Sequence, residues 1–170
     1  MEVVYYATCR TPWVNLLVAS GAQGLLAVRS IPRGEEESAL AWLQKRHPGT
    51  KLVHSAEVNR SALEELEAYC RGNSQTFTVP LDLHGSPFQI RVWQALRRIP
   101  FGETRSYADV ARALECPNAF RAVGMANRTN PLCIVVPCHR VIGSDGNLCG
   151  FGGGLKLKRL LLDHEKRQRS

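Results

Sequence analysis

A cysteine and a histidine stand next to each other at Cys138 and His139, and their side chains suit nucleophilic chemistry. A cysteine attacks as the thiolate, and only a few per cent of an ordinary thiol is ionised at neutral pH, so a nucleophilic Cys138 needs a base or a positive field. His139, Arg140 and an acid elsewhere in the chain are the candidates. A buried structural cysteine is an equally good interpretation from these residues alone. The adjacent His139 does not prove a catalytic pair, because neighbouring side chains on a strand point to opposite faces.

The six cysteines indicate neither a disulfide framework nor a metal site. They are unevenly spread over 170 residues and include no C-x-x-C pair. The spacing of Cys133, Cys138, His139 and Cys149 also differs from the paired ligands of structural zinc sites. We therefore expect reduced thiols in a cytoplasmic protein, and no bound metal.

The positive charge is confined to the second half of the chain. Residues 1–79 hold eight basic and eight acidic residues, whereas residues 80–170 hold fourteen and seven, which accounts for the net charge of +7. This asymmetry is typical of a domain that binds a polyanion, because Lys and Arg placed on phosphates release counterions. A basic solvated surface explains the charge alone equally well. No apolar run reaches the roughly 18 residues that would cross a bilayer.

The first half, residues 1–79, predicts a small lobe of strands and helices. Residues 3–7, 13–19 and 25–28 have the composition of strands, and a hairpin-like turn separates the last two. Residues 35–46 and 61–71 carry apolar residues at helical spacing. We expect an antiparallel sheet with two helices, in which His47 and His54 are surface residues.

The second half, residues 80–170, predicts a mostly helical lobe that starts with two capped helices. Ser86 and Gln89 form a capping box with Pro87 at the first helical position, and Ser106 with Asp109 opens the next helix. A tight turn then leads into a helix over residues 118–128. This helix, turn and helix is typical of a helix-turn-helix DNA-binding motif.

The chain around the cysteine predicts a strand followed by a loop. Residues 134–136 form a short apolar run, which we interpret as a buried strand. We expect Cys138 to lie in an exposed loop that follows this strand. A glycine-rich stretch over residues 150–154 then leads into a basic helix that begins at Leu155.

These motifs resemble the O6-alkylguanine-DNA alkyltransferases, which repair DNA by transferring an alkyl group to themselves. The resemblance centres on the run from Pro137 to Val141 and extends, in order, through motifs at residues 101–104, 106–107, 121–124, 130–131, 153–155 and 161–165. It covers essentially the whole second half, with a weaker similarity over the first.

The resemblance implies a role for each of five residues. Cys138 is the alkyl acceptor, His139 deprotonates it through a water, and Glu165 orients His139. Tyr107 positions the lesion and protonates the departing guanine, while Asn130 orders the loop that bears the nucleophile. Without the resemblance, Glu165 is a solvated acid, Tyr107 a half-buried aromatic and Asn130 a turn former before proline.

The resemblance also implies a DNA-binding surface and a lesion pocket. Arg121 is expected to enter the base stack where the flipped nucleotide was, and Arg128, Ala122 and Tyr107 to lie on the DNA-binding surface. The lesion pocket is expected to comprise Val141, Gly150, Phe151, Gly152 and Gly153. Phe151 stands where many relatives have Tyr, and Gly152 where they often have Ala or Ser, which predicts a roomier and more flexible pocket wall. Ala22 stands near an expected zinc ligand of some relatives, so we predict no metal in the first lobe.

The predicted fold is therefore mixed α/β, with an antiparallel sheet lobe (RNase H-like in the family) and a C-terminal winged-helix, helix-turn-helix domain. The predicted activity is a single-turnover, irreversible transfer from O6-alkylguanine in double-stranded DNA to Cys138, by a monomer docked in the minor groove without a cofactor. Two alternatives are a non-enzymatic lesion-binding protein and a turnover thiol transferase or hydrolase. The preferred alkyl group, activity on O4-alkylthymine and cooperative assembly on DNA stay open.

Overall fold

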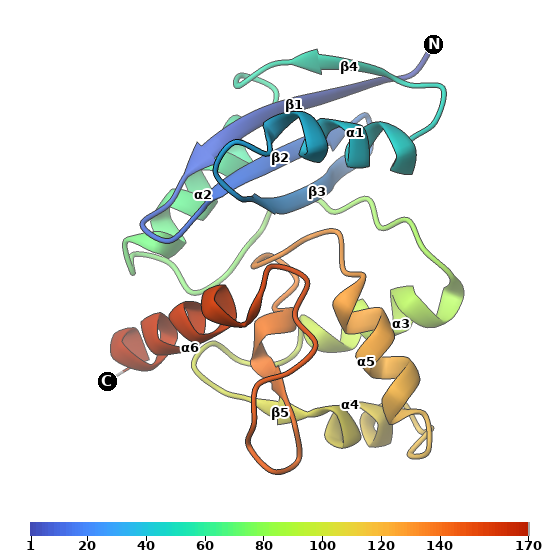
Figure 1. The fold of residues 1–170 in the computed structure, drawn as a ribbon, viewed down its shortest axis with the longest axis vertical. Coiled ribbons are helices and arrows are strands. Elements are labelled where there is room, and N and C mark those ends of the chain that lie inside the picture. The colour runs from blue at the N-terminus through green and yellow to red at the C-terminus, as the bar shows by residue number, and fades with distance from the viewer. Residues whose placement is uncertain (170) are drawn as a thin grey trace. The chain divides into compact units, whose positions relative to one another are not determined.

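The first unit of the structure is built on a four-stranded sheet. The computed structural model describes residues 1–169 (Figure 1), and its sheet has the order β3-β2-β1-β4. The strands are β1 (Val3–Arg10), β2 (Asn15–Gly21), β3 (Gly24–Ile31) and β4 (Lys51–His54). β2 runs antiparallel to β1 and β3, which confirms the predicted antiparallel arrangement of these three strands. β4 runs parallel to β1 and was not predicted, because its four residues lack a clear alternation.

Two helices complete this unit. α1 (Glu36–Arg46) contributes Ala39 and Leu43 to a core that also contains Leu17 of β2 and Leu26 of β3, and α2 is Arg60–Cys70. The prediction that His47 is a surface residue is wrong, because His47 follows the last turn of α1 and is only 8% exposed. Its backbone N–H donates to the Leu43 carbonyl at 3.0 Å and continues the hydrogen-bonding pattern of α1 by one residue.

Residues 80–82 belong to the first unit because their backbone pairs with the start of β3. The Leu25 N–H donates to the Pro80 carbonyl at 2.8 Å, and the Asp82 N–H donates back to the Leu25 carbonyl at 2.9 Å. Gly24 has a φ of 147°, and a Cβ there would lie 2.6 Å from the Pro80 carbonyl oxygen. The first compact unit is accordingly Met1–Leu83, and the second begins at His84, four residues later than the expected division between residues 79 and 80.

Three helices form the core of the second unit: α3 (Pro87–Leu96), α4 (Tyr107–Ala113) and α5 (Phe120–Arg128). Both predicted capping boxes are present, at Ser86 with Gln89 and at Ser106 with Asp109. The indole N–H of Trp93 donates to the Ala126 carbonyl at 2.8 Å, which ties α3 to α5. α5 begins two residues later than predicted, because the Ala119 N–H closes a turn onto Cys116.

The remaining elements surround the cysteine. A 3-10 turn, η1 (Cys138–Arg140), is followed by β6 (Val141–Ile142), which pairs in parallel with β5 (Arg105–Ser106), and the unit ends with α6 (Leu155–Arg169). This pairing brings the start of α4 beside the chain that leaves Cys138. The helical character of the second unit confirms the predicted fold class. None of the described helices is long and apolar enough to cross a membrane.

The predicted strand over residues 134–136 is wrong. These residues form turns in which the Val136 N–H donates to the Leu132 carbonyl at 2.8 Å and the Cys138 N–H to the Val136 carbonyl at 2.7 Å. Ile134 takes the left-handed conformation, with a φ of 73°, which is unusual for a β-branched residue. A short apolar run is compatible with any buried conformation, so its composition does not distinguish a strand from a buried turn.

Candidate active site

Cys138 lies at the start of η1 and is only 3% exposed, so the expectation of an exposed loop position is wrong. Residues 131–141 are all buried, because the apolar turn before Cys138 folds into the core of the second unit. Asn130 holds this turn together. Its amide Nδ2 donates to the Val136 carbonyl at 2.9 Å, and its Oδ1 accepts from the Leu132 N–H at 2.9 Å.

The surroundings of Cys138 favour its thiolate. Hydrogen bonding from the Cys133 side chain and from Asn130, together with the positive charge of Lys158, lowers the pKa of Cys138 despite its burial. The same contact and burial raise the pKa of Cys133 well above its usual value. Of these two thiols, Cys138 is therefore the one that ionises first.

His139 is fully buried and bonded to Glu165. Its Nε2 lies 2.6 Å from Oε1 of the carboxylate, while Nδ1 has no hydrogen-bond partner among residues 1–169. Burial lowers the pKa of His139 even though Glu165 opposes this effect, so the ring is neutral at neutral pH. Because an ionised carboxylate only accepts, the proton of the neutral ring sits on Nε2. Nδ1 is then the basic nitrogen.

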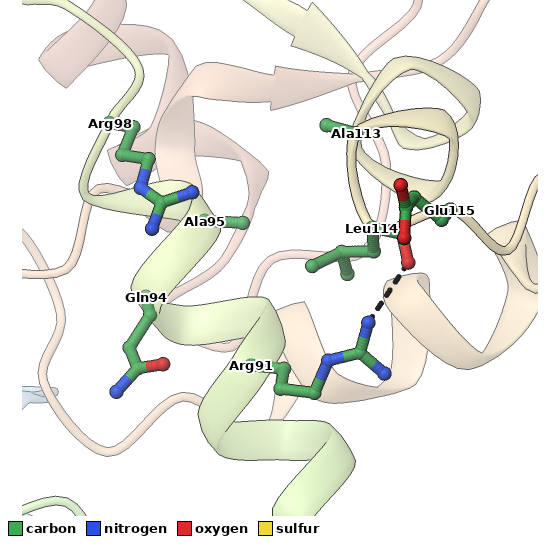
Figure 2. Close-up of a pocket in the computed structure, with 7 residues that line it drawn as sticks. All are labelled: Arg91, Gln94, Ala95, Arg98, Ala113, Leu114 and Glu115. Atoms are coloured by element: carbon green, nitrogen blue, oxygen red, sulfur yellow. Dashed lines mark hydrogen bonds between the residues drawn. The ribbon is translucent and has the colours of Figure 1, made fainter.

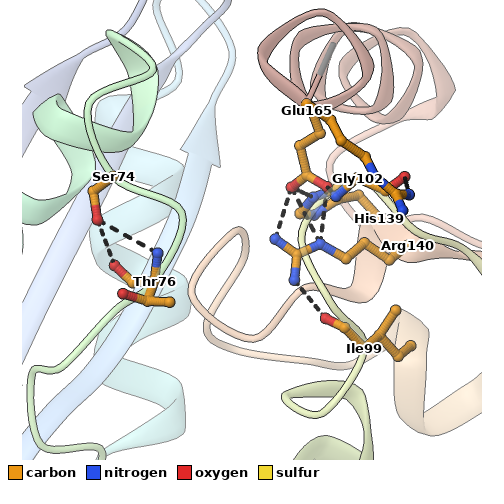
Figure 3. A network of polar contacts seen from close by, with 8 residues as sticks. Ser74, Thr76, Ile99, Gly102, His139, Arg140 and Glu165 are labelled. Carbon is orange, nitrogen blue, oxygen red and sulfur yellow. Dashed lines mark hydrogen bonds and ion pairs between the residues drawn. The ribbon is translucent and has the colours of Figure 1, made fainter.

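The carboxylate of Glu165 is held by donors from two segments, η1 and the turn at Gly102 (Figure 3). Besides His139, Arg140 donates from Nε to Oε2 and from Nη2 to Oε1, both at 2.9 Å, and the Gly102 N–H donates to Oε2 at 3.0 Å. Arg140 also donates from Nη1 to the Ile99 carbonyl at 2.7 Å. Burial by itself would raise the pKa of Glu165, but the hydrogen bonds from His139 and Arg140 hold it far below its usual range.

Lys158 is a second buried cation that the sequence analysis missed. Its Nζ donates to the Val141 and Cys149 carbonyls, at 2.5 and 2.8 Å, and lies 5.8 Å from the ring centre of Tyr107. Burial lowers the pKa of Lys158. The helical period of α6 could have predicted the burial of Lys158. The buried residues of this helix form one stripe: Leu157, Lys158, Leu161, His164 and Glu165.

Tyr107 and the glycine-rich loop form one wall of the site. The Tyr107 hydroxyl donates to the Cys149 carbonyl at 2.6 Å, and burial raises its pKa, so the group stays protonated. Gly150 has a φ of 64°, and a Cβ there would lie 3.0 Å from the Tyr107 hydroxyl oxygen. Val141 and Phe151 are buried, and Gly153 is half-buried.

The structure shows a packing role for Gly152, while the expected widening of the pocket stays a prediction. A Cβ at this position would lie 2.9 Å from the Arg128 carbonyl oxygen, so the glycine lets the loop approach the end of α5. Asn127, a further residue that the sequence analysis missed, joins the same parts. Its buried amide donates to the Cys138 carbonyl at 3.3 Å and to the Gly150 carbonyl at 3.5 Å.

Of the expected DNA-binding residues, the three on α5 lie apart from this buried cluster, whereas Tyr107 belongs to it. Arg121, Ala122 and Arg128 are exposed on α5, whose other side buries Val123 and Ala126. The Arg121 guanidinium carbon lies 6.0 Å from the ring centre of Phe120. The structure thus brings together Cys138, His139, Glu165, Tyr107 and Asn130 around one loop, and leaves the arginines on the surface.

A separate hollow lies between α3 and the end of α4 (Figure 2). Its lining residues are Arg91, Gln94, Ala95, Arg98, Ala113, Leu114 and Glu115. Arg91 donates to the Leu114 carbonyl at 2.9 Å across this hollow. It contains no cysteine or histidine, so the nucleophilic chemistry belongs to the cluster at Cys138.

The chain is similar to known proteins in both sequence and fold. Residues 87–167 match the family model described as 6-O-methylguanine DNA methyltransferase, DNA binding domain. The inducible methylated-DNA–protein-cysteine methyltransferase of Bacillus subtilis is 45% identical over 156 residues, which are 92% of this chain and 87% of that protein.

Solved structures extend this similarity to both units. The crystal structure of Mycobacterium tuberculosis O6-methylguanine methyltransferase has a TM-score of 0.82 and 42% identity, and the match covers 97% of this chain and 94% of that one. A crystal structure of the M. tuberculosis protein in complex with DNA has a TM-score of 0.81 and 39% identity, with coverage of 96% and 94%.

The first prediction concerns the clamp on Glu165. Arg140→Gln removes the positive partner of a buried carboxylate, so we expect the free energy of unfolding to fall by about 3 kcal/mol. Urea denaturation followed by circular dichroism measures this change. As a control, Arg167→Gln on the exposed end of α6, the helix that carries Glu165, should change the free energy of unfolding by less than about 0.5 kcal/mol. Equal losses in the two variants would contradict a special role for Arg140.

Proposed function

The chain belongs to the family of O6-alkylguanine-DNA alkyltransferases, and we propose that Cys138 is its alkyl acceptor. It is a methylated-DNA–protein-cysteine methyltransferase, which acts in DNA repair by transferring an alkyl group from DNA to a cysteine. The observation that carries the proposal for Cys138 is the hydrogen-bonding arrangement of His139. Its Nε2 is bound to Glu165 while its Nδ1 stays without a partner among the described residues, and so provides a base at the neighbouring residue.

The buried cluster explains how the thiol is activated. In the proposed step, the Cys138 proton passes through a water to Nδ1 of His139. The imidazolium that forms is stabilised by the Glu165 carboxylate, which Arg140 and Gly102 hold in place. The positive charge of Lys158 favours the thiolate at the same time. No resident cofactor takes part in this step, because the alkyl donor is the damaged base itself.

The transfer itself is one substitution. The sulfur of Cys138 bonds to the alkyl carbon as the bond from that carbon to O6 of guanine breaks, and the electron pair moves onto the guanine. The protonated Tyr107 hydroxyl donates a proton or hydrogen bond to the departing base. The product is an S-alkyl cysteine, a stable thioether, so each chain reacts once. Gly150, Phe151, Gly152 and Gly153, with Val141, line the pocket for the O6-alkylguanine.

DNA is the macromolecular partner of this chain, and we propose that α4 and α5 dock it as a helix-turn-helix in the minor groove. Cys138 is 3% exposed, and a base inside a duplex does not reach a buried thiol, so the damaged nucleotide has to leave the stack. Arg121, which is exposed on α5, is the residue that we expect to fill the resulting gap. Arg128 and Ala122 lie on the same exposed side of this helix.

We also propose a compartment and an oligomeric state for this protein. All six cysteines are free thiols, which suits a reducing compartment such as the cytoplasm. We propose that the protein acts as a monomer, because one acceptor cysteine and one surface on α4 and α5 serve one lesion.

Replacement of the acceptor gives the most direct test. Cys138→Ser keeps the size of the side chain but removes the polarisable nucleophile, so we expect no alkyl transfer and nearly unchanged DNA binding. Intact-mass spectrometry after incubation with O6-methylguanine DNA should show one added methyl group per wild-type chain and none in the variant. Transfer near the parent rate would move the assignment to Cys133 or Cys149.

The relay predicts a specific pH dependence. Burial lowers the pKa of His139, so its basic form persists at and below pH 6.5, the ordinary value for histidine, and the transfer rate should fall only at lower pH. Glu165→Gln removes the carboxylate that stabilises the imidazolium, and should slow transfer at pH 7.5 by at least about 10-fold. Single-turnover rates with O6-benzylguanine between pH 5 and 8 measure both effects. An unchanged rate in a folded Glu165→Gln variant would exclude the relay.

Arg121 separates base extrusion from simple phosphate binding. If Arg121 fills the gap left by a flipped nucleotide, Arg121→Ala should slow repair of duplex O6-methylguanine far more than reaction with free O6-benzylguanine, which needs no extrusion. Single-turnover rates at saturating DNA make the comparison. Equal slowing of both reactions would indicate damage to the Cys138 pocket, and an unchanged duplex rate would return Arg121 to the ordinary basic surface.

A further inference from the structure

The exposed side of α5 carries a large apolar side chain that the proposed mechanism does not use. Met125 is 60% exposed, and Phe120 at the start of the same helix is 45% exposed. Across residues 1–169, the exposed large hydrophobic residues are Met1, Val58, Phe120, Met125 and Leu155. Two of these five thus lie on a helix of nine residues, and this same helix presents the exposed arginines. A single exposed apolar side chain is ordinary by itself, so the position of Met125 relative to the arginines decides what it contacts.

The helical period places Met125 between the two arginines. Arg121 is four residues before Met125 and Arg128 three residues after it, so all three lie along one side of α5. Ala122 and Gly124 are the small residues next to this line. Small neighbours let the backbone of a helix approach a narrow groove closely, and leave the long, unbranched Met125 side chain as the part that projects furthest between the arginines.

The spacing between Arg121 and Met125 along α5 can be compared with the spacing of base pairs along a duplex. Four residues of an α-helix rise about 6 Å, whereas consecutive base pairs are about 3.4 Å apart. With the Arg121 side chain in the gap of the extruded nucleotide, Met125 is thus about two base steps away if α5 follows the groove. Proteins that bend DNA from the minor groove use such apolar wedges to disturb stacking next to their contacts.

We propose that Met125 is an apolar wedge that packs against the bases about two steps from the extruded nucleotide and disturbs their stacking, which opposes the return of that nucleotide to the stack. The inference rests on the proposed docking of α5 on DNA, and adds a positioning residue that acts on the duplex. Met125 contributes apolar contact without charge, whereas Arg121 and Arg128 contribute contacts that salt weakens. This difference makes the role of Met125 separable from theirs.

The test compares three substrates: the same O6-methylguanine oligonucleotide as a duplex and as a single strand, and free O6-benzylguanine. Met125→Ala should lower the second-order rate constant for duplex repair by about 5- to 20-fold, the range expected when most of a buried methionine contact is lost. The single strand should lose less, and the rate with O6-benzylguanine should not change. Met125→Leu should restore most of the duplex rate, and Val58→Ala, at an exposed apolar residue of the first unit, should leave all three rates unchanged.

The salt dependence of duplex binding distinguishes the inference from the function on which it rests. Arg128→Ala should reduce the slope of log affinity against log salt by about one unit, while Met125→Ala should weaken binding without a change of slope. If Arg128→Ala alters the slope but Met125→Ala leaves the duplex rate unchanged, the wedge is refuted and the docking of α5 stands. If neither variant alters duplex binding or repair, the docking of α5 itself is refuted, and the wedge with it.

Discussion

A single buried carboxylate organises the reactive part of this protein. Glu165 has no exposed surface, and its donors are His139 and Arg140, which are 26 and 25 residues away in sequence, and the backbone of Gly102, 63 residues away. An unpaired carboxylate in such a position costs several kcal/mol. The second unit therefore folds stably only when α6, η1 and the turn at residue 102 have come together, and the position of His139 is fixed by the same event.

The same interactions link stability to chemistry. Arg140 balances the charge of Glu165, so the carboxylate stays ionised without drawing a full positive charge onto the buried ring of His139. The ring is left neutral with its proton directed at Glu165 and its basic nitrogen unoccupied. Lys158 then contributes the excess positive charge near the thiol. Each charge in the cluster thus has a defined partner, as the low dielectric of a protein interior requires.

The buried cluster around Cys138 and the exposed side of α5 are joined at the end of this helix. Asn127 is buried on one side of this helix and bonds to the Cys138 and Gly150 carbonyls, while Arg128 follows it on the exposed side. Gly152 allows the loop of the pocket to approach the Arg128 carbonyl. The helix that we propose to dock on DNA therefore also contacts the loop of the proposed lesion pocket.

The sequence by itself determined the features that depend on neighbouring residues. The capping boxes at Ser86 and Ser106 define α3 and α4, because a cap joins groups only three residues apart, and the order of motifs around Cys138 was sufficient to identify the family. Composition also placed the positive charge in the second half of the chain.

Only the tertiary structure decided the arrangement of the centre. The apolar run at residues 134–136 forms a buried turn instead of a strand, since burial rewards either conformation and the hydrogen bonds of Asn130 select the turn. The sequence does not distinguish Lys158 from the other basic residues of the last helix, and it gives Arg140 only as one of several candidates to activate Cys138, until the fold supplies the carbonyls and the carboxylate that pair with them. These partners are distant in sequence, and a charge is stable inside a protein only where the folded chain brings such partners to it.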